Sequence, residues 1–212
     1  MPQIPDASSA PPLLVVLSGP SGVGKDAALD ALKLLDRPWR FVITATTRPQ
    51  RPGEQDGVDY IFLETAAFLK MKERDDLLEC AQVYDYWYGV PRNQVRQGLQ
   101  DGKDVILKVD VQGADTVREL APEALFIFMI PSSLDELKSR LTKRETETPS
   151  QVALRLSNAQ SELGRVGEFD YRVVNREGQL EQAVAEIDAI ITAEKCRTRP
   201  RVVDFLLRSI PR

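Results

Sequence analysis

A glycine-rich stretch near the start of the chain, 19-GPSGVGK-25, has the residue types and spacing that bind phosphate. It follows the apolar run LLVVLS at 13–18 and begins a segment with helical periodicity. In the pattern G-x-x-x-x-G-K, the glycines let backbone N–H groups turn toward a phosphate, and the lysine adds a positive charge. We therefore predict that this stretch binds a nucleoside triphosphate.

The residue that follows this lysine is unusual, because it is Asp26. Serine or threonine normally follows Gly-Lys in such a loop, and its hydroxyl joins the shell around Mg²⁺. A carboxylate also suits Mg²⁺, which prefers oxygen ligands and commonly binds one or two carboxylates together with substrate phosphates. We predict that Asp26 helps to hold Mg²⁺, either directly or through a water molecule.

The composition limits the remaining chemistry. The 212-residue chain has no histidine, which excludes imidazole as an acid or base. Its net charge of -4 argues against a nucleic-acid partner, whose phosphates usually meet a basic surface. The two cysteines lack metal-ligand spacing, and no segment approaches the roughly 20 apolar residues of a membrane span. We expect a cytoplasmic protein without membrane or nucleic-acid partners, and its oligomeric state is open.

The strands and helices that must position the glycine loop can be predicted from the periodicity of apolar residues along the chain. Apolar runs that read as buried strands alternate with segments that read as helices, which predicts an α/β fold with a parallel β-sheet core flanked by helices. The predicted strands are 13–18, 105–110, 125–130 and 171–175. The predicted helices are 24–35, 91–101, 113–120, 133–144, 149–166 and 178–194.

Local composition divides the chain further. Residues 1–12 are rich in Pro, Ala and Ser, which predicts a disordered leader before one domain at 13–195. Within this domain, 36–90 interrupts the alternation with short strands and turns and reads as an insertion on the α/β frame. The polar segment inside about 140–160 could hinge a mobile lid. The basic tail at 196–212 is expected to be solvated or to dock a partner.

Three further motifs, together with the glycine loop, resemble guanylate kinases. They are 46-TTRPQRPGEQDGVDYIF-62, 78-LECAQVYDYWYGV-90 and 109-VDVQGA-114. The resemblance extends from about Leu13 to Glu194 and places several motifs in the family's order. It implies a P-loop kinase that uses Mg²⁺ with ATP as cofactor and transfers the γ-phosphoryl group to GMP, with the GMP-binding region at 36–90 and a helical lid.

The same resemblance implies which residues hold the phosphate of GMP. Arg48, Arg51, Tyr60 and Tyr88 are the implied contacts, and Glu54 and the hydroxyl of Thr44 lie in the same region. The residue types suit this role, because arginine pairs with two phosphate oxygens at once while tyrosine donates single bonds.

Glu79 and Asp110 are implied to contact the guanine ring. Guanine presents N–H donors at N1 and N2 that carboxylates accept, whereas adenine presents a bare acceptor at N1 that a carboxylate repels. Val90 departs from the family, which usually has a serine or threonine at this contact with the base. One missing hydrogen bond is worth about 0.5–1.5 kcal/mol, so GMP affinity should fall roughly tenfold at most.

On the ATP side, Lys25, Arg140, Arg144 and Arg155 are the implied catalytic residues, because the arginines match those that close over the transferring phosphoryl group. Phosphoryl transfer spreads charge over the equatorial oxygens, and mobile cations stabilise it without a catalytic base. Asn175 matches a residue near the adenine. The full set of implied ATP-binding residues is Gly19, Pro20, Ser21, Gly22, Val23, Gly24, Lys25, Asp26, Ala27 and Asn175.

A second departure stands beside Asp26, because Lys108 occupies a position where the family usually has the acid that holds hydrated Mg²⁺. Lys108 either pairs with Asp26 or touches phosphate. Two alternatives remain open: a ribose 1,5-bisphosphate phosphokinase on the same frame, which the carboxylates at Glu79 and Asp110 disfavour, and a non-catalytic module that binds phosphopeptides, which the intact glycine loop disfavours.

Overall fold

A computed structural model describes residues 10–83, 85–142 and 149–203, and its main sheet contains five strands in the order β2-β7-β1-β8-β9. Every neighbouring pair is parallel. The strands are β1 (Leu14–Ser18), β2 (Trp39–Phe41), β7 (Asp104–Lys108), β8 (Leu125–Pro131) and β9 (Tyr171–Asn175). The predicted α/β fold with a parallel core is confirmed.

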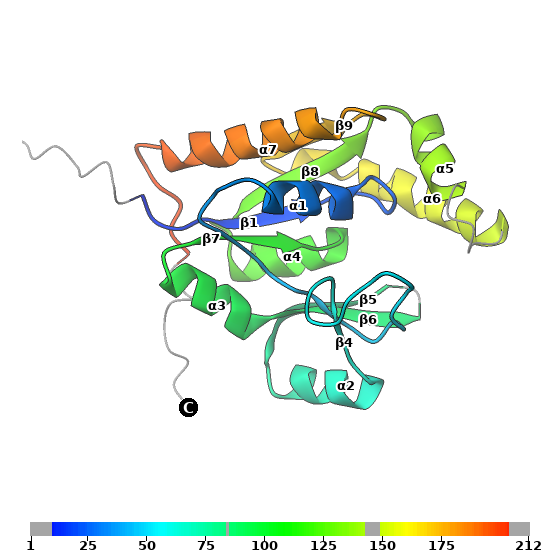
Figure 1. Cartoon of the computed structure of the whole chain (residues 1–212), viewed down its shortest axis with the longest axis horizontal. Helices are drawn as coiled ribbons and strands as arrows, with labels where there is room; N and C mark the ends of the chain where they lie inside the picture. The colour runs from blue at the N-terminus through cyan, green and yellow to red at the C-terminus, as the bar shows by residue number, and fades with distance from the viewer. Residues whose placement is uncertain (1–9, 84, 143–148, 204–212) are drawn as a thin grey trace, which may run out of the picture.

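Helices cover both faces of this sheet (Figure 1). On one face, Val15 and Leu17 of β1 pack in a cluster with buried residues of α1 (Lys25–Lys33) and α7 (Leu180–Lys195). On the other face, Leu14 and Val16 pack with residues of α3 (Arg92–Gln100) and α4 (Val111–Leu120). Because side chains alternate along a strand, β1 supplies apolar residues to both clusters, which explains its uninterrupted apolar sequence.

A smaller sheet with strand order β4-β3-β6-β5 lies beside the main body, next to helix α2 (Thr65–Glu73). Its strands are β3 (Ala45–Thr46), β4 (Ile61–Phe62), β5 (Leu77–Val83) and β6 (Tyr86–Pro91). Its own cluster is small and contains Phe68 of α2 between buried residues of the sheet. The region 36–90 is therefore not only an insertion, because its first strand, β2, forms an edge of the main sheet by pairing with β7.

The helices α5 (Leu134–Thr142) and α6 (Pro149–Leu163) project from the end of β8 and are followed by the 3-10 turn η1 (Val166–Glu168). They pack on each other through Leu137, Leu141 and Ala159. Residues 143–148, within the predicted lid, lie outside the described residues, as do residues 1–9 of the predicted leader.

The described part of the basic tail packs on the main body. Arg201 donates from Nε to Glu194 at 2.7 Å and from Nη1 to the Ala124 carbonyl at 2.9 Å, and Val203 is buried in the cluster that contains α4. Lys195 pairs with the buried Asp104 at 2.8 Å. These cations therefore pair within the chain instead of forming a free basic surface.

Candidate active site

The glycine loop connects β1 to α1, so that its backbone N–H groups lie at the carboxyl end of the central strand of the sheet. Gly24 has a φ of 102°, and a Cβ there would lie 2.4 Å from Nδ2 of Asn175. Gly19 has a φ of 142°, and a Cβ there would lie 2.4 Å from the Met129 carbonyl oxygen. Only glycine tolerates both a positive φ and the lack of space for a Cβ at these two positions. The two glycines therefore hold the loop in a conformation that can surround a phosphate.

Lys25 lies at the first position of α1 and folds back over the loop. Its Nζ donates to the Gly19 carbonyl and, at 3.2 Å, to the Pro20 carbonyl. Burial of the ammonium lowers the pKa of Lys25, and the nearby carboxylates of Glu162 and Asp26 oppose this shift. A phosphate oxygen is a stronger partner for an ammonium than a carbonyl is, so a bound triphosphate would draw Lys25 away from these two oxygens.

Asn175, a predicted ATP-binding residue, and Arg140, a predicted catalytic residue, both hold the glycine loop at the Val23 carbonyl. Nδ2 of the buried Asn175 donates to the Val23 carbonyl at 2.7 Å, and Nη1 of Arg140 donates to the same oxygen at 2.8 Å. Arg140 also donates to the Asn175 carbonyl at 3.0 Å and pairs with Glu136. In this structure both residues shape the loop, and their contacts with ATP stay predictions.

Asp26 and Lys108 form an ion pair at the mouth of the loop. Register explains their closeness, because β7 pairs with β1 so that Lys108 lies opposite Leu17, just before the loop begins. The Lys108 ammonium also donates to the Tyr60 hydroxyl at 2.8 Å and lies 4.4 Å from the centre of the Tyr60 ring. Burial disfavours the charged amine, but the charge of Asp26 raises the pKa of Lys108 above its ordinary value.

The predicted phosphate clamp assembles on the smaller sheet. Nη2 of Arg48 donates to Glu54 at 2.7 Å, and the guanidinium carbon lies 5.4 Å from the Tyr60 ring centre. The rings of Tyr60 and Tyr88 are 6.1 Å apart. Burial works against ionisation of Glu54, but hydrogen bonds from Arg48 and from the Arg51 backbone hold its pKa below the ordinary value. The exposed side chain of Arg51 stands at the edge of this group.

Glu79 and Asp110 face the same region from β5 and from the start of α4. Glu79 is only 6% exposed, and burial together with the charge of Asp110 raises its pKa to about 8. Asp110 is the N-cap of α4 and accepts from the Gly113 N–H at 2.7 Å. The absence of a side chain at Gly113 matters, because a Cβ there would lie 2.8 Å from Oε2 of Glu79. The carboxylates of Glu79 and Asp110 are therefore close enough to interact, and Glu79 is the buried member of the pair.

Two other predicted GMP contacts are buried. Val90 pairs in register with Glu79 across β5 and β6, yet its side chain is 0% exposed and belongs to the main apolar cluster. Thr44 is buried between β2 and β3, where its carbonyl accepts from the Ile61 N–H at 2.9 Å. Packing accounts for Val90 in this structure, and a contact of either side chain with the nucleotide stays a prediction.

The structure describes two of the three predicted lid cations, and they lie on different helices. Arg140 lies behind the loop on α5, Arg155 lies on α6, and Arg144 lies outside the described residues. Glu162 of α6 was not predicted, although it lies near Lys25 and one of its oxygens is buried without a hydrogen bond among the described residues. Residues three apart lie on the same face of a helix, and Glu162 follows the buried Ala159 by three. An acidic residue on the apolar face of α6 is the signal that could have identified it.

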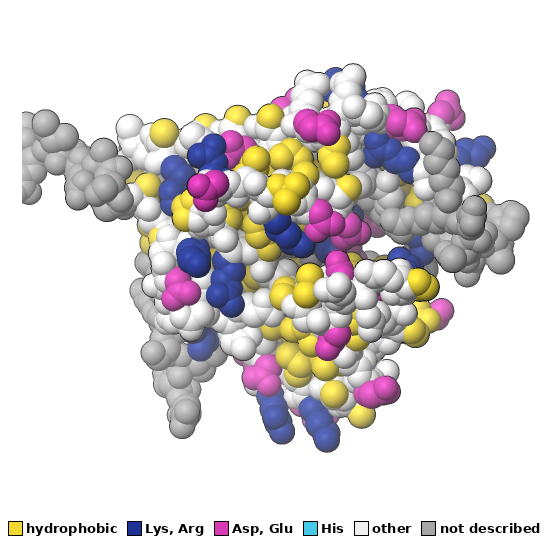
Figure 2. Space-filling view, viewed as in Figure 1, with side chains coloured by type: hydrophobic (Ala, Val, Ile, Leu, Met, Phe, Trp, Pro, Cys, Tyr) yellow, Lys and Arg dark blue, Asp and Glu magenta, His cyan; other side chains and the backbone are white. Residues whose placement is uncertain are grey.

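Figure 2 shows an opening between the smaller sheet and the arm formed by α5 and α6, with acidic and basic side chains on its edge. A glycine loop that follows the central strand of a parallel sheet and precedes a helix, next to a second site rich in Arg and Tyr, defines a P-loop kinase. Among the described residues, none of the helices is both long enough and apolar enough to cross a membrane.

Comparison with known proteins specifies the class. Residues 12–194 match the family model described as guanylate kinase, and the chain belongs to this family. It is 46% identical to guanylate kinase 2, chloroplastic/mitochondrial, of Oryza sativa subsp. japonica over 95% of this chain and 71% of the rice protein. It is 44% identical to guanylate kinase of Caldanaerobacter subterraneus subsp. tengcongensis over 87% of this chain and 89% of that protein.

The fold agrees with a solved structure of the same family. The crystal structure of guanylate kinase from Anaplasma phagocytophilum is 29% identical in sequence and superposes with a TM-score of 0.76. The alignment covers 90% of this chain and 89% of that chain. The sequence resemblance to guanylate kinases is therefore confirmed by both sequence and fold.

Proposed function

We propose that the protein transfers the γ-phosphoryl group of ATP to GMP, giving ADP and GDP. Two observations on the acceptor side carry this conclusion together: the pair of carboxylates Glu79 and Asp110, and a buried Arg48 that lies over the Tyr60 ring. Carboxylates accept from the N1 and N2 donors of guanine, and the arginine and tyrosine groups suit its phosphate. This arrangement supports a purine nucleotide with a proton-donating edge as the acceptor.

The two substrates would meet between the glycine loop and the phosphate clamp. The loop N–H groups and Lys25 bind the phosphates of ATP, while Arg48, Tyr60 and Tyr88 hold the acceptor phosphate. The attacking oxygen is already ionised near neutral pH, so the reaction needs positioning and charge stabilisation instead of a base. Arg140, Arg144 and Arg155 would supply further positive charge if the helices around them close over the substrates.

Mg²⁺ suits this site when most of its ligands come from the triphosphate and from water. Asp26 presents a side chain that is 64% exposed at the mouth of the loop. The described residues hold no group of three or more metal-binding side chains of His, Cys, Asp or Glu, so Asp26 would be a single protein ligand, directly or through water. When bound, Mg²⁺ would neutralise charge on the phosphates of ATP.

We test the role of Asp26 with Asp26→Ser, leaving Lys108 in place. We expect activity to fall and the Mg²⁺ concentration needed for half-maximal rate to rise, because the substitution removes a ligand and leaves the Lys108 ammonium beside the metal. A steady-state Mg²⁺ titration at saturating ATP and GMP measures both effects. Full activity with an unchanged Mg²⁺ requirement would exclude a role for this carboxylate.

We further propose that the protein works in the cytoplasm in purine nucleotide metabolism, recycling GMP and dGMP. Its two cysteines, Cys80 and Cys196, are free thiols, which fits a reducing compartment.

A coupled assay of ADP production tests the proposed function directly. GMP and dGMP should both support turnover, whereas AMP and ribose 1,5-bisphosphate should be poor acceptors, because neither presents guanine's donors to Glu79 and Asp110. Efficient turnover of the sugar phosphate without turnover of GMP would favour the sugar-phosphate kinase. ATP binding without transfer to any of the four acceptors would favour a non-catalytic module.

A further inference from the structure

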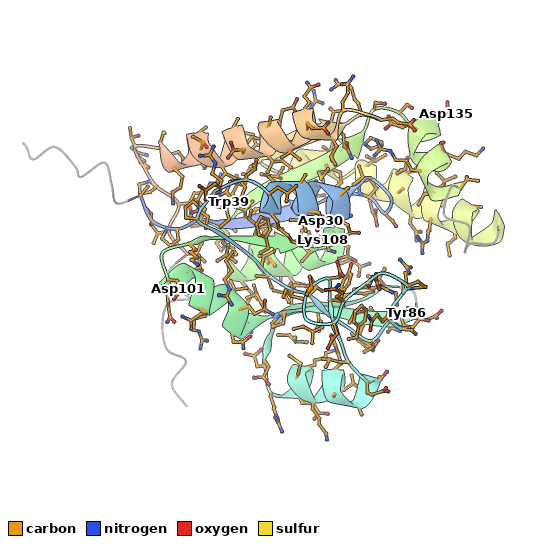
Figure 3. The ribbon with its side chains drawn as sticks, viewed as in Figure 1. Asp30, Trp39, Tyr86, Asp101, Lys108 and Asp135 are labelled. Atoms are coloured by element: carbon orange, nitrogen blue, oxygen red, sulfur yellow. The ribbon has the colours of Figure 1, made fainter. Side chains whose placement is uncertain are left out.

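Lys108 is a largely buried cation that belongs to neither of the two phosphate sites described above, yet it lies between them. It ends β7, and its side chain is only 15% exposed. In Figure 3 it lies below α1 and above the smaller sheet. A buried ammonium is costly unless it is paired and hydrogen-bonded, so its partners indicate why it is retained.

Those partners come from both sides of the active site. Asp26 belongs to the glycine loop and α1, and Tyr60 stands just before β4 on the smaller sheet. Within the described residues, these two bonds use two of the three N–H donors of the ammonium. One donor is left for a further oxygen, and the aspartate that pairs with the ammonium has a side chain that is itself mostly exposed.

The Tyr60 hydroxyl has one proton to donate and accepts the bond from Lys108 at 2.8 Å. Because Lys108 acts as the donor of that bond, the hydroxyl proton stays available for another acceptor, and the neighbouring Arg48 makes this a site for an anion. With the Lys108 bond of 2.8 Å on one side of the hydroxyl oxygen and a bond of about 2.7 Å on the other, a phosphate oxygen bound to Tyr60 would lie no more than about 5.5 Å from the ammonium.

We propose that Lys108 is a binding residue for the acceptor phosphate: it orients Tyr60 as a donor and adds its own charge, while Asp26 competes for the same ammonium. This inference rests on the proposed function, since the anion is taken to be the phosphate of GMP. It adds to the predicted clamp a cation from the main sheet, and it links that clamp to the loop that binds ATP.

Binding measurements on the full chain separate a phosphate contact from a structural role. We would titrate wild type and Lys108→Met with GMP and with guanosine, which has the same base but no phosphate. We expect the GMP dissociation constant to rise at least tenfold in Lys108→Met, with guanosine binding changed less than twofold. Lys103→Met is the matched control, because this exposed lysine precedes the same strand at its opposite end, away from the loop.

Two further variants fix the sign of the effect. Lys108→Arg keeps the charge and should hold the GMP dissociation constant within about threefold of wild type. Asp26→Asn, measured without ATP or Mg²⁺, removes the competing carboxylate and should tighten GMP binding.

GMP binding by Lys108→Met within twofold of wild type would overturn the proposal. Equal weakening of GMP and guanosine would also overturn it, because a structural defect affects both ligands. These outcomes differ from failure of the proposed function, in which wild type itself would neither bind GMP nor phosphorylate it.

Discussion

The glycine loop and the acceptor site achieve selectivity for anions by different means. The loop relies on backbone conformation, with glycines at positive φ and a lysine resting on carbonyl oxygens. The acceptor site relies on side chains from β5, β6, α4 and the loops around β3 and β4, and two of its charged groups, Arg48 and Glu79, are buried. A backbone cradle accepts any triphosphate, whereas buried side chains can reject the wrong base. We therefore expect the smaller sheet and the start of α4 to determine which acceptor is phosphorylated.

The largest expected effect lies on the loop side. Lys25→Met removes the charge that would follow the transferred phosphoryl group, and we expect kcat to fall by roughly 10²–10³, the usual loss when a transition-state donor is removed. GMP binding should remain unchanged, because Lys25 belongs to the other site. Steady-state kinetics together with GMP titration would check this separation, and a loss of GMP affinity equal to the loss of kcat would contradict it.

A substitution in the clamp should show the opposite pattern. Arg48→Met removes a charged bond to phosphate and leaves Glu54 without its guanidinium partner, so we expect KM for GMP to rise about 10–150-fold. KM for ATP should change little. Initial rates with each substrate varied in turn would measure both constants, and Arg37→Met, at a surface ion pair with Asp188, serves as a control.

An equal rise of KM for ATP and KM for GMP in Arg48→Met would contradict the assignment of ATP binding to the glycine loop and of GMP binding to the acceptor site.

The pH dependence of GMP binding should reveal the buried carboxylate. Because the pKa of Glu79 is about 8, this group carries a proton at pH 6, and guanine needs the ionised form as acceptor. GMP binding must therefore release a proton, and the dissociation constant should fall by up to about tenfold per pH unit between pH 6 and pH 8 and then level off. Calorimetric titration in buffers of different ionisation enthalpy would detect the released proton.

The same pKa sets the sign of a stability effect. The folded protein keeps the Glu79 proton up to about pH 8, whereas the unfolded chain loses it near its ordinary value of 4.5. The stability of the free protein associated with this group is therefore present at low pH and lost as the pH rises from 4.5 to 8. Glu79→Gln is the control for both effects, because glutamine does not titrate. Once the ionisation of the GMP phosphate is subtracted, the pH profile of GMP affinity should be flat in this variant, and the stability change between pH 4.5 and 8 that comes from Glu79 should be absent.

The smallest expected effect concerns Val90. Val90→Thr restores a hydroxyl at the position where the family usually has one, but the side chain lies in a closed apolar cluster. We expect the free energy of unfolding to fall by about 1–3 kcal/mol, because a buried hydroxyl without a partner is costly, and GMP affinity to change less than threefold. Chemical denaturation and GMP titration would measure the two quantities. A tenfold gain in affinity would instead place this side chain at the base.

The sequence predicts the main sheet well, because strands such as 125–131 are buried on both faces and leave uninterrupted apolar runs. The edge strand β2 and the strands β3 and β4 were not predicted individually. They contain two or three residues each, and they are defined by pairing with distant strands instead of by their own pattern.

In the candidate site, too, local motifs were predicted from the sequence and contacts between distant segments were not. The glycine loop is a local motif, so its place after β1 follows from the sequence alone. The closeness of Lys108 to Asp26 was one of two arrangements that the sequence allowed, and strand register decides between them. The contact of Lys108 with Tyr60 depends on how the smaller sheet packs against the main body, and no local pattern encodes it.

The central claim is that the carboxylates of Glu79 and Asp110 select guanine, and the ratio of kcat/KM for GMP to kcat/KM for AMP tests it most directly. We expect a ratio of about 10³–10⁵ in wild type, because AMP presents an acceptor at N1 and no N2 donor to Glu79 and Asp110, and we expect a marked decrease of this ratio in Glu79→Gln. A wild-type ratio below ten, or a ratio that Glu79→Gln leaves unchanged, would contradict the account.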